Sequence, residues 1–364
     1  MLKHPLHALC PYFAMFPEGF VAEHVQAWSD EGDIVLDPFS GRGTTLLQSL
    51  LMRRKAVATD INPVAYCISA AKAAPPVKQA LLGRLHELKA AFGGYSGDIA
   101  DLPDFFDWAF SREVLAQLLF LRSNLRWRTS ALDNFLAALV LGSLHGEMDK
   151  STSYFSNQMP RTISTKPAYS VKYWRKHKLF PPARDVFSIL EKRIELRYSA
   201  AMPEEKGLVA LTDARLCSDC FPAFEDKVRL VVTSPPYFNV TNYEEDQWLR
   251  LWFLGNEAFP TYRRVSRDDR HSSADNYWHF LTDVWEGMAP LLRKGAVLVC
   301  RIAGKGITRK DLTAHLVDTV ETAFPHAYLL EKPRISKIRN KQTATFQPNG
   351  RGCFFEVDHI FRLS

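Results

Sequence analysis

Cysteine is scarce and scattered in this chain of 364 residues. Six cysteines stand at positions 10, 67, 217, 220, 300 and 353, and only Cys217 and Cys220 are close neighbours. A single C-x-x-C without a second Cys or His pair is weak evidence for zinc. We therefore expect reduced thiols, no metal site and a cytoplasmic protein.

Long hydrophobic runs are also missing. The longest apolar stretch, near residues 135–144, is too short to cross a bilayer. Residues 1–11 contain neither a long apolar core nor a small-residue cleavage site, so we expect no signal peptide and no membrane association.

Acidic residues are absent from one long stretch of a mildly basic chain, which has 46 Lys+Arg against 40 Asp+Glu. Residues 151–184 contain no Asp or Glu, and aromatic residues such as Tyr173 and Trp174 stand among their cations. This mixture suits phosphate contacts combined with stacking on bases or sugars, although a solvated basic loop is the alternative. The candidate nucleic-acid contacts in this segment are Arg161, Lys166, Lys172, Arg175 and Lys178. A second acid-free segment, 333–352, adds Arg339 and Lys341.

The segment 231–237, Val-Val-Thr-Ser-Pro-Pro-Tyr, is the pattern around which we organise the chain. It completes an apolar, β-branched run that begins at Val228 and is typical of a buried parallel strand. The two prolines hold Ser234 and Pro235 in extended backbone. In an open α/β sheet, ligands bind just beyond such a strand end.

No strong nucleophile stands in this segment, which favours binding chemistry over covalent chemistry. The Ser234 hydroxyl and the Pro235 carbonyl can accept the two N–H groups of a planar amine, while Tyr237 stacks on its ring. Two acceptors that hold the hydrogens out of plane favour a tetrahedral, more nucleophilic nitrogen. The alternative is a strand that simply leaves the sheet through a Pro-Pro turn.

Residues 34–45, Ile-Val-Leu-Asp-Pro-Phe-Ser-Gly-Arg-Gly-Thr-Thr, predict a strand, a glycine turn and a helix that Thr44 or Thr45 caps. Leu46 occupies the third glycine position of the dinucleotide fingerprint, which argues against that motif. An acid at the end of the strand suits a cationic or amine-bearing ligand. Asp60 ends the next strand, where such folds bind a ribose diol. A ligand that combines a nucleoside, a positive charge and an amine is S-adenosylmethionine.

These motifs together resemble those of the amino-methylating DNA methyltransferases. The resemblance rests on DPFSGRGTT at 37–45, TDINP at 59–63 and TSPPY at 233–237, and it covers roughly residues 4–75 and 207–305. Family members transfer a methyl group from S-adenosylmethionine to the exocyclic amine of cytosine or adenine. Ser-Pro-Pro-Tyr resembles the cytosine-N4 subgroup, because Asp or Asn in place of Ser234 is commoner in the adenine-N6 subgroup. Residues 4–17 resemble the motif that folds over the methionine end of the cofactor.

The resemblance implies a set of site residues. The implied catalytic residues are Ser234, Pro235, Pro236 and Tyr237. Asp37 and the glycines would surround the methionine part, Asp60 would bind the ribose, and Asp213 would meet the adenine amine unless it only caps a turn. The full implied cofactor set is His7, Tyr12, Asp37, Pro38, Phe39, Ser40, Gly41, Gly43, Thr44, Thr45, Asp60, Ile61, Asp213, Ala214 and Thr233.

The expected fold class is α/β: a Rossmann-like class I methyltransferase with a seven-stranded, mostly parallel sheet, helices on both faces and a helical insertion. We expect residues 1–75 and 207–364 to form the catalytic domain. Residues 76–206 would form the insertion and carry much of the DNA recognition. Segments 327–330 and 354–361 would make the antiparallel pair that closes such sheets.

The predicted function is methylation of cytosine N4 in double-stranded DNA, with the target base flipped out of the helix. Restriction-modification, or a related defence context with a cognate partner protein, follows from the resemblance only. Three alternatives stay open: the same chemistry on adenine N6, methylation of an RNA base, and a catalytically silent protein that binds cofactor and nucleic acid. The oligomeric state is left open.

Overall fold

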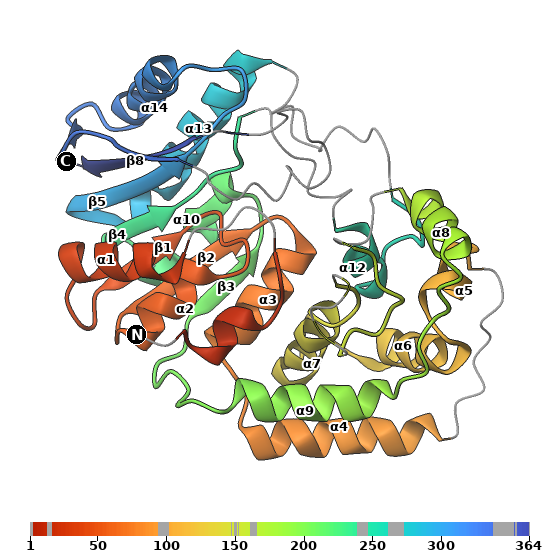
Figure 1. Cartoon of the computed structure of the whole chain (residues 1–364). Coiled ribbons are helices and arrows are strands. Elements are labelled where there is room, and N and C mark those ends of the chain that lie inside the picture. Colours follow the sequence, from red (N-terminus) through yellow and green to blue (C-terminus); the bar gives the residue numbers. More distant parts are fainter. Residues whose placement is uncertain are drawn as a thin grey trace. The chain divides into compact units, whose positions relative to one another are not determined.

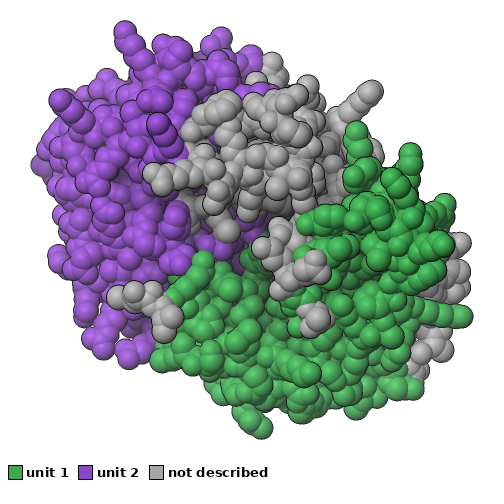
Figure 2. All heavy atoms as spheres, viewed as in Figure 1, with its two compact units in different colours: residues 1–11, 74–202, 243–262 green, residues 12–73, 203–242, 263–364 purple. Residues whose placement is uncertain are grey.

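The structure is a computed structural model, shown as a ribbon in Figure 1. It describes residues 3–12, 17–93, 102–146, 148, 151, 153–160, 166–238, 247–260, 273–337, 353 and 355–363. The chain divides into two compact units, coloured separately in Figure 2. Residues 12–73, 203–242 and 263–364 form the sheet unit, and residues 1–11, 74–202 and 243–262 form the helical unit.

The sheet unit is built on one eight-stranded sheet in the order β3-β2-β1-β4-β5-β8-β6, with β7 also paired to β8 (Figure 1). Strands β1 to β5 run parallel to one another. The strands are β1 Ile34–Asp37, β2 Lys55–Asp60, β3 Leu208–Leu211, β4 Val228–Thr233, β5 Leu292–Ile302, β6 Tyr328–Leu329, β7 Arg334–Lys337 and β8 Phe355–Arg362.

Alternate side chains of the central strands pack on opposite faces of the sheet. Val35, Val232 and Val299 pack in a cluster with residues of α1. Leu36 and Val231 face the other way, into a cluster with α13 and α14. Because both faces are covered, the strands read as continuous apolar runs and not as an alternating pattern.

Helix α1 precedes the first strand, and the other helices of the sheet unit that the structure describes lie between its strands in sequence. The α-helices are α1 Glu18–Trp28, α2 Thr44–Leu51, α3 Pro63–Ala73, α10 Cys217–Cys220, α13 Ala274–Met288 and α14 Arg309–Ala323. The 3-10 helices are η2 Ala214–Leu216, η3 Pro222–Phe224 and η5 Ala289–Leu291.

Strand β8 runs antiparallel to β5 and β6, and this confirms the predicted fold class and its antiparallel end. The sheet has one strand more than the seven expected. Strand β7 pairs with the first half of β8, from Arg334↔Asp358 to Lys337↔Phe355, while β6 pairs with its end. The predicted basic segment 333–352 therefore begins as a strand, and Arg334 forms ion pairs with Glu23 and Glu331.

The helical unit consists of helices in the part of the chain that the structure describes. They are η1 Pro5–Ala8, α4 Lys78–Phe92, α5 Phe105–Ala109, α6 Arg112–Asn124, α7 Ala131–Leu141, α8 Pro167–Lys176, α9 Val186–Arg197 and α12 Trp248–Phe253. The side chains of Ser111, Ser130 and Asp185 cap α6, α7 and α9 by accepting backbone N–H bonds. None of the helices described in either unit is long and apolar enough to cross a membrane.

Two segments lie in a different unit from the one that the sequence suggested. Residues 1–11 and 243–262 belong to the helical unit, although we expected them in the catalytic domain. The carbonyl of Leu9 lies so close to Gly142 that a Cβ there would approach it to 2.3 Å. The Arg122 guanidinium donates to the Trp252 carbonyl at 2.8 Å. Such contacts join segments far apart in the chain, so local sequence patterns do not reveal them.

The close packing of α13 on η2 gives a test of the fold. A Cβ on Gly287 would lie 2.1 Å from the backbone oxygen of Arg215. We expect Gly287→Ala to lower the free energy of unfolding by roughly 1–3 kcal/mol, because backbone must move to admit the methyl group. Gly19→Ala is the matched control: Gly19 lies in α1 with nothing within 4 Å, so its substitution should be neutral or slightly stabilising. Equal melting temperatures for the two variants would contradict this packing.

Candidate active site

The candidate site lies at the side of the sheet where β1, β2 and β4 end, which we call its carboxyl end. β1 pairs in parallel with both β2 and β4. Their last residues are Asp37, Asp60 and Thr233, so three predicted site residues reach the same side of the sheet. Asp213 follows β3, which pairs in parallel with β2. This is the side on which open α/β sheets bind their ligands.

The turn after β1 requires glycine for two separate reasons. Gly41 and Gly43 have φ values of +52° and +70°, a backbone region that L side chains rarely adopt. A Cβ on Gly43 would also lie 2.9 Å from the Ser69 hydroxyl oxygen. The turn therefore presents backbone where other residues would present side chains.

Helix α3 holds this turn through residues that the sequence analysis missed. The Ser40 hydroxyl donates to Ser69 Oγ at 2.8 Å, and the Ser69 hydroxyl donates to the Gly41 carbonyl at 3.1 Å. The fully buried Lys72 donates from Nζ to the Arg42 carbonyl. No sequence motif marks Ser69 or Lys72, because each acts through a turn more than twenty residues away.

The threonines after the turn do not cap α2 as predicted. The N-cap residue is Gly43, whose left-handed backbone makes the entry without a side-chain bond. Thr44 opens the helix and accepts from Arg42 Nε at 3.2 Å. Thr45 donates to the Val232 carbonyl at 3.0 Å and so connects α2 to β4.

Asp37 is a buried carboxylate that connects the two predicted motifs. It is 1% exposed, and Thr233 donates from Oγ1 to Asp37 Oδ1 at 2.7 Å. The backbone N–H of Phe39 donates to the same oxygen at 3.1 Å. Burial raises the pKa of Asp37 from its ordinary 3.8 to about 7, although the bond from Thr233 opposes the rise.

Asp60 closes the other side of the glycine turn. Its Oδ2 accepts from the Gly41 N–H at 2.8 Å, and its Oδ1 accepts from the Asn62 N–H at 2.9 Å. Asp60 is partly exposed, and each carboxylate oxygen can accept more than one hydrogen bond. The residue therefore orients the turn and can still accept from a ligand hydroxyl. Its neighbour Ile61 is 51% exposed.

Asp213 caps η2, which is the alternative role that the sequence analysis gave it. Its Oδ1 accepts from the Arg215 N–H at 3.0 Å, and its Oδ2 pairs with Arg215 Nη2 at 2.8 Å. Its exposed fraction is 17%, and the next residue, Ala214, is buried at the start of η2. A role toward an adenine amine would have to share this carboxylate with Arg215.

Of the remaining residues of the cofactor set, Pro38, Phe39 and Tyr12 belong to the sheet unit and lie in or beside the glycine turn. The Pro38 carbonyl accepts from Thr59 Oγ1 at 2.8 Å, and the ring of Phe39 lies 6.0 Å from that of Phe280. Tyr12 Cε1 is 3.9 Å from where a Cβ on Gly41 would stand. His7 belongs to the helical unit, where it is buried.

The Ser-Pro-Pro-Tyr segment follows β4, and hydrogen bonds at Pro236 and Phe238 hold it in place. Tyr277 of α13 donates its hydroxyl proton to the Pro236 carbonyl at 2.8 Å. The N–H of Phe238 donates to the Ala303 carbonyl at 3.1 Å, so the chain stays beside the continuation of β5. Ser234 and Tyr237 are both partly buried. The segment therefore has a defined path beyond the carboxyl end of the sheet.

Tyr237 has a partner that the sequence gave no reason to expect. Its hydroxyl donates to Glu356 Oε1 on β8 at 2.7 Å. Burial, together with the charge of Glu356, raises the pKa of Tyr237 well above its ordinary value, so the phenol stays protonated. Glu356 lies more than a hundred residues further along the chain, and only the antiparallel pairing of β8 with β5 brings it to this place.

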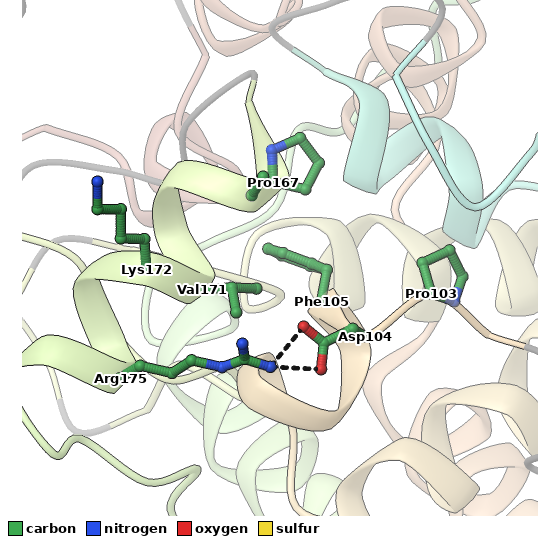
Figure 3. Close-up of a pocket in the computed structure, with 8 residues that line it drawn as sticks. Pro103, Asp104, Phe105, Pro167, Val171, Lys172 and Arg175 are labelled. Carbon is green, nitrogen blue, oxygen red and sulfur yellow. Dashed lines mark hydrogen bonds and ion pairs between the residues drawn. The ribbon is translucent and has the colours of Figure 1, made fainter.

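The predicted DNA contacts that the structure describes gather on and beside α8. Lys172 and Arg175 line a pocket of about 440 Å³ between α5 and α8. Arg175 pairs with Asp104 at 2.9 Å and lies over the ring of Trp108, whereas Lys172 extends away from that pair (Figure 3). Lys166 is the N-cap residue of α8 without a side-chain capping bond, and Lys178 follows the end of the helix. Arg161, Arg339 and Lys341 lie outside the described residues.

The first part of the chain, which includes the glycine turn of the candidate site, is similar to known proteins. Residues 3–71 match a family of DNA methylases, N6_N4_Mtase. The matched range contains the glycine turn and Asp60, and it stops before Ser234. The match therefore covers DPFSGRGTT and TDINP but not TSPPY.

Curated relatives match over short stretches. The orphan methyltransferase M.BamHII of Bacillus amyloliquefaciens is 48% identical over 54 residues, which are 15% of this chain and 20% of that protein. The type II methyltransferase M.MvaI of Kocuria varians is 32% identical over 98 residues, 24% of this chain and 21% of that one. The chain thus spans about a fifth of the length of these relatives.

Solved structures with a similar arrangement include two methyltransferases. One is the rRNA methyltransferase aviRa from Streptomyces viridochromogenes, with a TM-score of 0.36 and 14% identity, covering 100% of this chain and 90% of that one. The other is a SAM-dependent methyltransferase from Methanosarcina mazei, with a TM-score of 0.37 and 8% identity, covering 96% and 99%. The class I fold assignment rests on the strand order of this chain.

The residues at the carboxyl end fit S-adenosylmethionine. Two acids end adjacent strands, and the glycine turn between them presents backbone instead of side chains. Such a surface admits a nucleoside with a cationic group beside a carboxylate. Among the residues described, no three His, Cys, Asp or Glu side chains lie where they could hold a metal ion.

The raised pKa of Asp37 predicts a pH-dependent stability in the cofactor-free protein. The folded form releases its proton near pH 7 and the unfolded form near 3.8, so this stabilising contribution is full below pH 3.8 and disappears as the pH rises through 7. Relative to Asp37→Asn, the wild type should lose roughly 4 kcal/mol of unfolding free energy between pH 4 and pH 8. Denaturant unfolding of both proteins across this range measures the difference. A constant difference would show that Asp37 ionises at its ordinary pKa.

Proposed function

We propose that this chain is an S-adenosylmethionine-dependent DNA methyltransferase that methylates an exocyclic base amine, with cytosine N4 as the favoured target. The single observation that supports it most is the hydrogen bond from Thr233 to Asp37, which joins the strand of the DNA methylase match to the strand of Ser-Pro-Pro-Tyr. It holds the Ser-Pro-Pro-Tyr segment, which would bind the amine in this proposal, beside the end of the strand that leads into the glycine turn. The motif also suits adenine N6, and the Ser at position 234 favours cytosine.

In this function, the glycine turn and its acids bind the cofactor. The bound cofactor supplies an electrophilic methyl group on a sulfonium, whose departure needs no metal. Asp60 accepts from the ribose hydroxyls while Gly41 and Asn62 hold its carboxylate in place. Asp37 lies where a positive charge on the ligand favours its ionised form, so binding should release a proton near neutral pH.

The Ser-Pro-Pro-Tyr segment binds the target base. Ser234 Oγ and the Pro235 carbonyl accept the two amine hydrogens, and the Tyr237 ring stacks on the base. The bond from Tyr277 to the Pro236 carbonyl keeps the proline turn from rotating. A base inside duplex DNA cannot reach these groups, so it must be flipped out of the helix.

The helical unit binds the DNA backbone in this proposal. Helix α8 and its flanks contain Lys166, Lys172, Lys176 and Lys178, with no acidic residue in the helix itself. Tyr169 is 59% exposed and Phe180 is 72% exposed beside these cations. Exposed cations interleaved with exposed rings suit phosphate contacts and stacking. Arg175 is already paired with Asp104, so we assign the phosphate contacts to the lysines.

Two other candidate functions, RNA methylation and binding without turnover, would give different reaction products. The pocket chemistry alone would also suit a base in RNA, and a protein that binds without turnover would show no product at all. Transfer of labelled methyl from S-adenosylmethionine to duplex DNA and to total RNA, followed by nucleoside analysis, tests all of them. N4-methylcytosine from DNA is the expected product. Label in RNA alone, or in neither polymer, would contradict the proposal.

A variant of Ser234 tests the chemistry at the strand end. We expect Ser234→Ala to lower the single-turnover rate of methyl transfer about 10- to 100-fold, because the lost hydrogen bond strengthens as the nitrogen becomes tetrahedral. Tyr237→Ala should instead weaken capture of the flipped base. A mismatch at the target position lowers the cost of flipping and should rescue only Tyr237→Ala. Equal rescue of both variants would refute this division of roles.

The α8 lysines give a salt-dependence test. Replacing Lys166, Lys172 and Lys178 together by Ala should weaken DNA binding and flatten the slope of log K against log salt by up to about 3, since each phosphate contact contributes about 0.9. Replacing Lys78, Lys89 and Lys192, on other helices of the same unit, is the matched control and should leave the slope near wild type. If both triple variants keep the wild-type slope, α8 is a solvated surface.

A defence context is the last part of the proposal. Two of the relatives are called type II methyltransferases, and we extend that setting to this chain, with a cognate nuclease or defence protein as its partner. Base-by-base sequencing of methylated positions in the native host DNA would give the recognition sequence. Random placement of the modified bases would contradict a site-specific enzyme.

A further inference from the structure

Helix α9 presents two arginines, Arg193 and Arg197, on one of its faces, and we call them the α9 arginine pair. They stand four residues apart, so their side chains lie one turn from each other on the same side of the helix. Arg197 is 6% exposed and Arg193 is partly buried. The Nε atom of each is enclosed and has no hydrogen-bond acceptor among the residues that the structure describes. Two like charges are therefore held together where water screens them poorly.

Other buried arginines of this protein show two ways of satisfying a guanidinium. Arg301 donates to the two carboxylate oxygens of Asp358, at 2.6 and 2.9 Å. Arg54 is 5% exposed and donates to the carbonyls of Met52 and Ser29, at 2.7 and 2.6 Å. Either arrangement offsets the cost of removing a charge from water. The α9 arginine pair has much less, because no Asp or Glu that the structure describes forms an ion pair with it.

The surroundings of the pair supply one long hydrogen bond and one aromatic ring. Arg193 Nη2 donates to the Ser153 carbonyl at 3.3 Å, and its guanidinium lies 5.8 Å from the ring centroid of Tyr154. Burial and the charge of Arg193 lower the pKa of Arg197 from 12.5 to about 10, while the Cys10 thiol opposes the change. Arg197 therefore still carries its charge at neutral pH. The dipole of α9 favours a cation in the last turn, but its half charge cannot balance two guanidinium groups.

We propose that the α9 arginine pair is a binding site for a phosphate group. A guanidinium donates two parallel hydrogen bonds to phosphate oxygens, and a phosphate group has enough oxygens to engage both arginines. A carboxylate has two oxygens and fills one guanidinium. Arg193 is only partly buried, so an anion can approach the pair from solvent. Both arginines belong to the helical unit, and the site would exist whether or not the protein transfers methyl groups.

Thermal unfolding in inorganic phosphate, with chloride at matched ionic strength as the reference, tests the site. About 50 mM phosphate should raise the melting temperature of the wild type by about 2–5 °C. In chloride, Arg197→Met should be at least as stable as the wild type, because an unbalanced buried charge is removed. The same variant should not respond to phosphate. Lys192→Met is the matched control on the exposed side of α9 and should keep the wild-type response.

A second variant keeps the test decisive if Arg197→Met fails to fold. Arg197→Lys retains the charge but loses the planar pair of donors, so calorimetry should show phosphate binding about 10-fold more weakly. Acetate should shift the wild-type melting temperature less than phosphate does. Three results would overturn the inference: no phosphate-specific shift in the wild type, an equal shift with acetate, or unchanged phosphate affinity in Arg197→Lys.

Duplex DNA in the same assays identifies the source of the phosphate. If the site takes a phosphate of the nucleic-acid backbone, Arg197→Met should flatten the slope of log K against log salt by about 0.9, and inorganic phosphate should compete with DNA. If it takes free phosphate, the slope should stay at the wild-type value and phosphate should still stabilise the DNA complex. A wild-type protein that responds to phosphate but transfers no methyl group would contradict the proposed function and leave this site in place.

Discussion

The buried hydrogen bond between Thr233 and Asp37 is the interaction on which the candidate site depends. It joins the ends of β4 and β1 at 2.7 Å, in a position where water cannot compete. An unsatisfied carboxylate at that depth would be costly, and even with its bonds the Asp37 pKa rises to about 7. The bond thereby holds the end of β1, which leads into the glycine turn, beside the end of β4, which leads into Ser-Pro-Pro-Tyr.

Around this bond, each segment is supported by a different layer of the sheet unit. Helix α3 holds the glycine turn through Ser69 and Lys72. Helix α13 holds the proline turn through Tyr277, and β8 holds Tyr237 through Glu356. The two groups of the proposed reaction are thus positioned independently. Polar side chains that look like ordinary helix and strand residues in the sequence take part in every one of these supports.

Much of the fold could be predicted because its signals are local. The apolar run 228–232 and the short run 34–36 identified two central strands. Two predictions were wrong for different reasons. Thr44 does not cap α2 because the N-cap residue is Gly43, whose left-handed backbone makes the entry locally. The sheet has an eighth strand because β8 is long enough to pair with both β6 and β7.

The sequence by itself determined the chemistry that is available: the acids after two strands, the glycines between them, and a serine and tyrosine held by two prolines. Composition and motif spacing suffice for this because each group belongs to a short continuous segment. Only the tertiary structure decided which groups meet. Glu356 reaches Tyr237, and Arg301 reaches both Glu356 and Asp358, through the antiparallel pairing of β8 with β5. Sequence patterns cannot reveal it, because a hydrogen bond across a sheet depends on register and not on separation along the chain.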